Sequence, residues 1–211
     1  MIESTPGIIL RTRPLTETSL IVNWLTPGLG RVSTVAKGAR RPKSSFRGKL
    51  DLFYEADLSF QRSRRSELHA LREVSLRETH AALREEMGWL QQASYCAALI
   101  EQVTERETPL PAIYELMRGL LAALPQLPPR PPTLFSFELK LLNELGLGPD
   151  LAEAKLTPGA KLIAEKLATL DWPDLARLKP SDAQNRELQQ FLQSFMINHL
   201  EKIPANRAAA L

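Results

Sequence analysis

The spacing of apolar residues changes once along the chain, close to residue 80. Before that point, short runs alternate apolar and polar positions with a period near two, which is the repeat of a half-buried β-strand. These runs cover residues 7–13, 20–25, 31–37, 50–60 and 68–76. Turn residues separate them, most clearly the Pro27-Gly28-Leu29-Gly30 stretch between the second and third runs. The pattern therefore predicts five short strands.

After residue 80, apolar residues recur at spacings of three and four, which is typical of amphipathic helices. The predicted helices cover residues 81–105, 113–124, 133–146, 158–170 and 181–203. The run at 133–146 is the most apolar, so we expect it at the centre of a helical bundle. Gly146 is placed to cap its end and Ser181 to cap the start of the last helix.

Two segments of the second half lack a clear helical pattern. The proline-rich run PQLPPRPP at residues 125–132 predicts an extended connection between helices. A ligand for a proline-recognition module is the other interpretation of this run. Residues 205–211 (ANRAAAL) are expected to be a frayed end.

These patterns place the chain in the α+β class with two domains, a β-barrel at residues 1–79 and an all-helical domain at residues 80–211. Five strands with an irregular connection after the third match a Greek-key barrel of the oligonucleotide/oligosaccharide-binding (OB) type. A meander or an SH3-like barrel fits the pattern nearly as well. Charge divides at the same place: residues 1–80 carry 14 Lys and Arg against 8 Asp and Glu, a net of +6, and residues 81–211 carry 13 against 16, a net of −3. We therefore expect the two domains to have different partners.

The positive charge of the first part is concentrated in residues 31–49, which contain seven cations and no acid. The cations are Arg31, Lys37, Arg40, Arg41, Lys43, Arg47 and Lys49. Basic side chains gain affinity for a phosphodiester backbone by releasing its condensed counterions, so nucleic acid is the first candidate ligand. Arg62, Arg64 and Arg65, between the fourth and fifth predicted strands, would extend this surface. A solvated charged loop is the alternative.

Aromatic side chains could add base stacking to this electrostatic surface. The candidates are Trp24, Phe46 and Tyr54. An aromatic residue in a small barrel also fits a place in its core, so both roles stay open for these three.

Several classes of function find little support in the sequence. One cysteine, Cys96, and three scattered histidines cannot form a four-ligand zinc site, and no cofactor motif or phosphate-binding Gly-x-x-x-x-Gly-Lys loop is present. Paired carboxylates for nuclease chemistry could come from Glu55 and Asp57, or from Glu85 and Glu86. Glu85 and Glu86 are consecutive on a predicted helix, so their side chains diverge by about 100° and cannot face one metal together. Glu55 and Asp57 share one face of a predicted strand, and this face fits exposure to solvent. We therefore expect no enzymatic activity. Without a signal peptide or an apolar stretch long enough to span a bilayer, a soluble, cytoplasmic protein with no membrane partner is expected.

Four motifs, in order, resemble the RecO family of bacterial recombination mediators. They are RTRPLTET at residues 11–18, LTPGLGR at 25–31, VAKGARR at 35–41 and FELKLLNELGLGPDL at 137–151. The resemblance implies an N-terminal OB-fold barrel followed by a helical domain. Many family members insert a zinc-binding cysteine cluster after the last motif, whereas residues 152–159 (AEAKLTPG) contain no cysteine. The resemblance thus predicts a metal-free member.

The resemblance also implies a function in DNA repair and recombination, on the nucleoid. Such a protein binds single- and double-stranded DNA, anneals complementary strands and works with RecR to load RecA onto DNA coated by single-stranded DNA-binding protein. An RNA- or ribosome-associated OB-fold protein is the alternative.

The resemblance further implies that the helical domain docks the acidic C-terminal tail of single-stranded DNA-binding protein. Such a tail needs an apolar pocket with cations at its rim. The candidate residues are Arg118, Arg130, Phe135, Leu139, Lys140 and Leu142. Ordinary bundle core is the other interpretation of the three apolar side chains.

Overall fold

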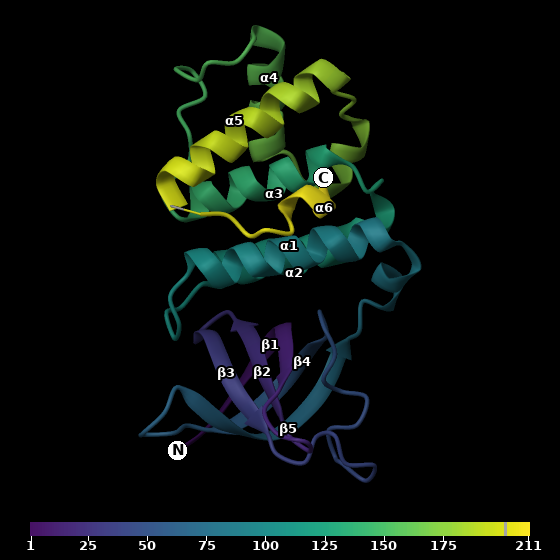
Figure 1. The fold of residues 1–211 in the computed structure, drawn as a ribbon, viewed down its shortest axis with the longest axis vertical. Coiled ribbons are helices and arrows are strands. Elements are labelled where there is room, and N and C mark those ends of the chain that lie inside the picture. Colours follow the sequence, from purple (N-terminus) through teal and green to yellow (C-terminus); the bar gives the residue numbers. More distant parts are fainter. Residues whose placement is uncertain (201) are drawn as a thin grey trace. The chain divides into compact units, whose positions relative to one another are not determined.

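A computed structural model describes residues 1–200 and 202–211, which form two compact units (Figure 1). The first, here called the barrel unit, contains residues 1–81 and 104–115. The second, the helical unit, contains residues 82–103 and 116–211. The barrel unit is therefore built from two separate stretches of the chain.

The barrel unit contains five strands, β1 (Ile2–Pro14), β2 (Leu20–Thr26), β3 (Gly30–Ala36), β4 (Glu55–Gln61) and β5 (Leu68–Glu78). They close in the order β1-β2-β3-β5-β4, and β4 pairs with β1. β3 and β5 are parallel, whereas the other neighbours are antiparallel. A meander would keep its strands in sequence order, so the crossover from β3 to β4 excludes it. The predicted OB-type barrel followed by helices is confirmed.

The barrel core is filled by apolar side chains from all five strands and from the connection between β3 and β4. Trp24 is fully buried, and its indole Nε1 donates a hydrogen bond to Oγ1 of Thr34 at 2.9 Å. Phe46 leaves the connection and joins the same cluster as Trp24 and Phe60. The long β3–β4 connection is thus anchored to the barrel through an aromatic side chain.

The fourth strand begins later than the apolar pattern predicts. Residues 50–54 form a turn in which the backbone N–H of Leu52 donates to Oδ1 of Asp51 at 2.8 Å. Phe53 has a φ of 66° and is 1% exposed. The prediction of a strand from residue 50 was wrong because a buried aromatic on a turn looks like one more alternating strand position.

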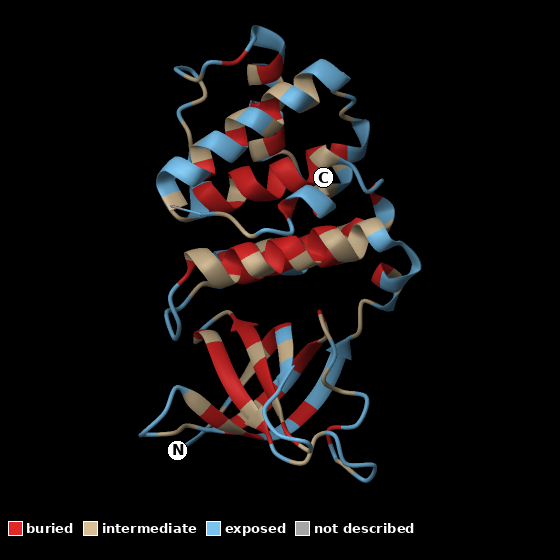
Figure 2. Ribbon diagram, viewed as in Figure 1, coloured by how far each residue is buried: buried red, intermediate tan, exposed pale blue. Residues whose placement is uncertain are grey.

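Beyond the barrel the chain forms helices (Figure 1). They are η1 (Ala81–Glu85), α1 (Met87–Val103), α2 (Pro111–Ala123), η2 (Leu124–Gln126), α3 (Pro131–Glu144), α4 (Pro158–Thr169), η3 (Trp172–Arg177), α5 (Asp182–Leu200) and α6 (Arg207–Ala210). α3 contacts α1, α4, α5 and η3 and is buried along almost its whole length (Figure 2). The most apolar helix therefore occupies the centre, as the pattern predicts.

Both predicted helix caps are present. Gly146 has a φ of 70°, the N–H of Leu147 donates to the carbonyl of Leu142 at 2.8 Å, and the N–H of Gly146 donates to that of Asn143 at 3.0 Å. This pair of bonds is the Schellman arrangement, which favours glycine because the left-handed conformation strains other residues. At α5, Ser181 accepts from the N–H of Gln184 while the Gln184 side chain accepts from the N–H of Ser181, which forms a reciprocal capping box.

Three predictions for the helical region were wrong in detail. The helix expected at 81–105 divides into η1 and α1. The proline-rich run is not wholly extended, because η2 contains Pro125 and α3 begins at Pro131, where a missing N–H costs no helical hydrogen bond. The expected frayed end at 205–211 contains α6, whose Arg207 is 4% exposed.

Candidate nucleic-acid interface

One row of β3 side chains points away from the barrel core and joins two basic regions. Val32, Thr34 and Ala36 are core-facing, so the alternate positions Arg31, Ser33 and Val35 face outward. Arg31 and Ser33 line one pocket, and Val35 and Lys37 line another. Strand β3 therefore connects the surface around the β4–β5 loop with that around the β3–β4 connection.

The first region is a pocket of about 520 Å³ between β3, the β4–β5 loop and residues 106–107. Arg31, Arg62, Arg64, Arg65 and Arg106 contribute its positive charge. The structure thus brings Arg31 together with the three arginines predicted from the next loop. It also adds Arg106, which no local sequence pattern places on the barrel.

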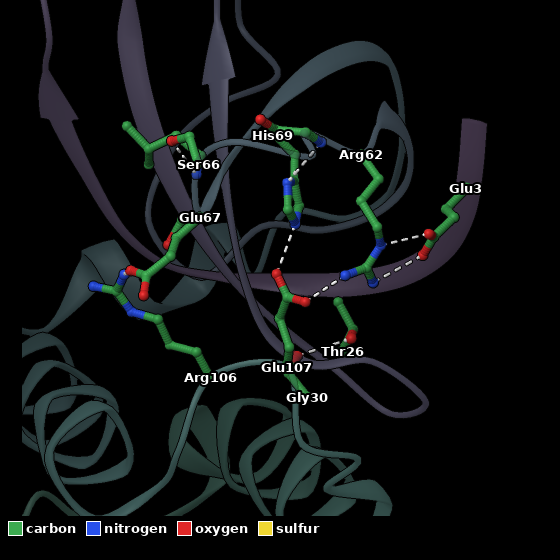
Figure 3. Close-up of polar contacts among 12 residues, drawn as sticks. Glu3, Thr26, Gly30, Arg62, Ser66, Glu67, His69, Arg106 and Glu107 are labelled. Atoms are coloured by element: carbon green, nitrogen blue, oxygen red, sulfur yellow. Dashed lines mark hydrogen bonds and ion pairs between the residues drawn. The ribbon is translucent and has the colours of Figure 1, made fainter. Parts of the chain in front are cut away.

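Arg106 forms an ion pair with Glu67, and two further arginines are occupied by internal contacts; Figure 3 shows the contacts of Arg106 and Arg62. Arg62 binds both carboxylate oxygens of Glu3, with its Nε 2.6 Å from Oε1, and it also pairs with Glu107. Arg31 donates from Nε to Oγ1 of Thr104 at 2.7 Å and from Nη2 to the Thr104 carbonyl. These two guanidinium groups therefore help to hold the barrel unit together.

Glu107 is the centre of this network (Figure 3). Its carboxylate accepts from Arg62 and lies 2.8 Å from Nε2 of His69, whose side chain is 2% exposed. Burial alone would raise the pKa of Glu107, but the hydrogen bonds from Arg62 and His69 outweigh it and lower the pKa. The hydrogen bond from Arg62 likewise lowers the pKa of Glu3. The hydrogen bonds that Arg62 donates to Glu3 and Glu107 raise the pKa of Arg62 itself. Both carboxyl groups are thus held in the charged form.

The second region is the β3–β4 connection, a series of tight turns. The N–H groups of Arg41, Ser44 and Arg47 each donate to the carbonyl three residues earlier. Five of the predicted cations on it are exposed, namely Lys37, Arg40, Arg41, Lys43 and Arg47. Within the described part of the chain, none of these five forms an ion pair. Their charge is directed to solvent and is available to a polyanion.

Lys49, at the end of the connection, differs from these five. Its Nζ donates to the carbonyl of Val74 at 3.0 Å, and the residue is half-buried. It lies in a third pocket of about 430 Å³, on the β4–β5 side of the barrel, together with Arg72. The charged group of Lys49 is therefore used in a contact within the barrel unit, unlike those of the five exposed cations.

The three aromatic candidates separate by burial. Trp24 and Phe46 belong to the barrel core and are 0% and 8% exposed, so of the two roles that the sequence leaves open they take the core one. Tyr54 is half-buried and packs at the edge of the same core. It lines a pocket of about 460 Å³ with Arg40, Arg41 and Arg47, which we call the Tyr54 pocket.

Comparison with known proteins decides the family. The model for the recombination protein O N-terminal domain matches residues 1–80, and the model for the C-terminal domain matches residues 90–154. Together they cover more than half of the chain. The chain belongs to the RecO family.

Several curated RecO proteins are similar to this chain. The DNA repair protein RecO of Tolumonas auensis is 35% identical over 71% of this chain and 62% of its own length. The RecO protein of Pseudoalteromonas atlantica is 39% identical over 71% of this chain and 60% of its own length. The RecO protein of Anaeromyxobacter dehalogenans strain 2CP-C is 34% identical over 69% of this chain and 57% of its own length. The match thus spans roughly three fifths of these relatives.

The RecO-family matches cover all five strands, most of α1, and the whole of α2 and α3. Within α3, the predicted docking residues Phe135, Leu139 and Leu142 are core side chains, each no more than 1% exposed. The expectation that they line an open groove was therefore wrong, because α3 is surrounded by helices.

The three cations predicted beside them lie nearer the surface. Arg118 and Arg130 are exposed. Lys140 is half-buried, its Nζ donates to the carbonyl of Leu170 at 2.5 Å, and it lies 4.2 Å from the centre of the Trp172 ring. Burial lowers the pKa of Lys140.

The carboxylates considered for nuclease chemistry have structural partners. Glu55 is 8% exposed and accepts from the hydroxyl of Tyr114 at 3.0 Å, whereas Asp57 pairs with Arg77 at 2.7 Å. Among residues 1–200 and 202–211, no group of three or more His, Cys, Asp or Glu side chains is arranged to hold a metal ion. No described helix is both long and apolar enough to cross a membrane.

Sequence reasoning missed the contribution of residues 104–108 to the barrel unit. This polar stretch, Thr-Glu-Arg-Glu-Thr, follows a helix and precedes a proline, so it resembles an ordinary interhelix loop. Its partners are more than 30 residues away in the sequence, and no local pattern indicates them.

Proposed function

We propose that this chain binds DNA through its barrel unit and acts as a non-enzymatic mediator in recombinational DNA repair. The observation that carries the proposal is the group of five cations on the β3–β4 connection of an OB-type barrel, which are exposed and form no ion pair with a described residue. The barrels of this fold bind oligonucleotides on the face formed by β2 and β3 and on the loops that border it. Membership of the RecO family supports the same assignment.

Both single- and double-stranded DNA are ligands in this proposal, because the phosphate contacts are independent of sequence and strandedness. Arg64 and Arg65 extend the surface at the other end of β3, where both are exposed. Annealing follows from the same electrostatics. A cationic surface that holds two polyanionic strands reduces their repulsion and raises their local concentration, and no covalent step is needed.

The partner functions rest on the family membership. The proposal is that the protein acts with RecR to load RecA onto DNA coated by single-stranded DNA-binding protein, whose acidic tail docks on the helical unit. Phe135, Leu139 and Leu142 are core side chains. We therefore place the binding site for the tail on the surface around Arg118, Arg130 and Lys140. Charge reversal of each cation, followed by calorimetry with a tail peptide, tests this placement.

The DNA-binding assignment is tested by the salt dependence of affinity. Replacing Arg40, Arg41 and Lys43 with alanine should weaken binding to unrelated DNA sequences equally. It should also reduce the slope of log affinity against log salt by about 0.7–0.9 for each phosphate that the variant no longer binds. A matched variant with Lys155, Lys179 and Arg186 changed to alanine removes the same charge from exposed sites of the helical unit and should bind like wild type. Equal slopes for the two triple variants would refute the placement.

The RNA-binding alternative is tested by competition. Single-stranded DNA and RNA of equal length and sequence compete for the protein in one titration. The proposal expects DNA to bind at least as tightly as RNA, and a strong preference for RNA would favour the alternative.

A further inference from the structure

The Tyr54 pocket combines an apolar floor with a cationic rim. Leu20, Ala39, Leu50 and Tyr54 supply apolar surface, and all four pack against the barrel core. Arg40, Arg41 and Arg47 lie around it and are exposed. The pocket therefore suits a ligand with an apolar, flat part and a neighbouring negative charge.

Backbone hydrogen bonds fix the walls of this pocket. The N–H of Arg40 donates to the carbonyl of Thr18 at 3.0 Å, which ties the β3–β4 connection to the β1–β2 loop. Opposite, the N–H of Phe53 donates to the carbonyl of Ile9 at 2.9 Å, and the N–H of Ile9 donates to the carbonyl of Tyr54 at 3.0 Å. Because both walls are held by the barrel, little conformational entropy is lost when a ligand enters.

Asp51 adds a feature that a simple phosphate pocket would not have. Asp51 lines the pocket, and its Oδ1 accepts a hydrogen bond from the N–H of Leu52. Carboxylate oxygens accept hydrogen bonds, and an exocyclic amino group of a base is a suitable donor. The three arginines of the rim favour an anion there, and the apolar floor favours a neutral ring.

We propose that the Tyr54 pocket receives one unpaired base of a DNA strand, which stacks on Tyr54 while Arg40, Arg41 and Arg47 bind the flanking phosphates. This inference rests on the DNA-binding function proposed above and adds a basis for strand selectivity. A base in a duplex is already paired and stacked, so it enters only after the helix is opened. Stacking therefore strengthens the binding of single strands and contributes nothing to an intact duplex.

The first test uses the unaltered protein. Anisotropy titrations compare a single-stranded oligonucleotide with one of equal length in which internal nucleotides are abasic, so the phosphates are kept and the bases are removed. The wild-type protein should bind the abasic strand about five- to 150-fold more weakly, in the range of one stacked base. Equal affinity for the two strands would overturn the inference.

The second test changes the floor of the pocket. Tyr54→Leu keeps an apolar side chain of similar reach but removes the aromatic face. It should lower the ratio of single-strand to hairpin-duplex affinity by a similar factor and should abolish the discrimination against the abasic strand. Tyr54→Phe keeps the ring and should recover both properties. A 2-aminopurine base in the strand should lose fluorescence on binding to the wild type and to Tyr54→Phe, but not to Tyr54→Leu.

Failure of this inference is distinguishable from failure of the proposed function. If Tyr54→Leu retains wild-type selectivity while the Arg40, Arg41 and Lys43 variant still loses affinity and salt dependence, the pocket assignment fails and DNA binding stands. If neither variant changes binding, DNA is bound elsewhere and both proposals fail. Should Tyr54→Leu prove unfolded by circular dichroism, the abasic comparison on the wild type decides the question.

Discussion

Arg207 and Glu138 form a two-pronged ion pair in the core of the helical unit. Nε of Arg207 lies 2.7 Å from Oε1 of Glu138, and Nη2 lies 2.9 Å from Oε2. Both side chains are buried, and the hydroxyl of Tyr95 also donates to Oε1 at 2.7 Å. Although burial alone would lower the pKa of Arg207, its bonds to Glu138 raise it, so the guanidinium stays charged. The short last helix is therefore fixed to the centre of α3.

Removing Arg207 should strongly destabilise the protein. Arg207→Ala leaves the Glu138 carboxylate buried without its counter-ion, which typically costs about 3–5 kcal/mol. Arg177→Ala is the matched control, because it removes an arginine from an exposed pair with Asp174 and should cost at most about 1 kcal/mol. Urea unfolding measures both changes. Similar midpoints for the two variants would contradict a structural role for the buried pair.

The carboxylates around Arg62 should make stability dependent on acid pH. Glu3 and Glu107 have pKa values below their ordinary 4.5, so each contributes stability that is fully present above that value. This contribution is lost as the pH falls through the lowered values of the folded state. Glu3→Gln and Glu107→Gln should each reduce stability at pH 7 by up to about 1 kcal/mol and flatten the decline below pH 4.5.

The measurement is the urea midpoint as a function of pH. Glu105→Gln provides the control, since this neighbouring acid is exposed and makes no ion pair within the described residues. Its pH profile should match that of the wild type. A steeper acid decline in Glu107→Gln than in the wild type would reverse the expected sign.

Gly30 should not tolerate a side chain. Its φ is 66°, and a Cβ there would lie 1.8 Å from the backbone oxygen of Thr108. Gly30→Ala therefore combines backbone strain with a clash against backbone, and we expect a loss of at least about 2 kcal/mol. Gly28→Ala, two residues earlier in the same turn, meets nothing within 4 Å and should be near neutral. Thermal denaturation of the two variants makes the comparison directly.

Replacing Arg62 should affect mainly stability and replacing Arg64 mainly DNA binding, although the two residues are neighbours in one basic loop. Arg62→Ala breaks the pairs with Glu3 and Glu107 and should lower stability by about 1 kcal/mol or more. Arg64→Ala removes an exposed cation that has no ion pair among the residues described, and it should leave stability within about 0.5 kcal/mol while it weakens DNA binding. Unfolding and anisotropy titrations on both proteins check this, and a larger stability loss for Arg64→Ala would contradict the assignment.

Most of the fold could be predicted because the strands and helices carry their own periodicity. The apolar stripe of α3, Gly146 and Ser181 act within a few residues, and the sequence shows them directly. Phe53 and Arg207 could not be placed in this way. A turn that directs an aromatic side chain into a core, and a terminal arginine whose partner is 69 residues distant, depend on the complete fold.

The candidate site shows the same division. Charge clustering identified Arg40, Arg41 and Lys43, which are exposed and unpaired in the described chain. It could not separate them from Arg31 and Arg62, because the partners of those two arginines come from β1 and from residues 104–107. Thr104 accepts hydrogen bonds from Arg31, and the carboxylates of Glu3 and Glu107 pair with Arg62. The sequence shows how many cations a segment has, whereas the fold determines which of them are exposed to solvent and form no internal contact.

The return of residues 104–115 to the barrel unit has a consequence for dissecting the protein. The chain passes from one unit to the other at three points, after residues 81, 103 and 115. A single proteolytic cut therefore cannot release the barrel, and a fragment that stops at residue 80 lacks Thr104 and Glu107, the partners of Arg31 and His69. Such a fragment would contain every strand and still lack part of the compact barrel unit, so the family match ends at a different place in this chain from the barrel unit.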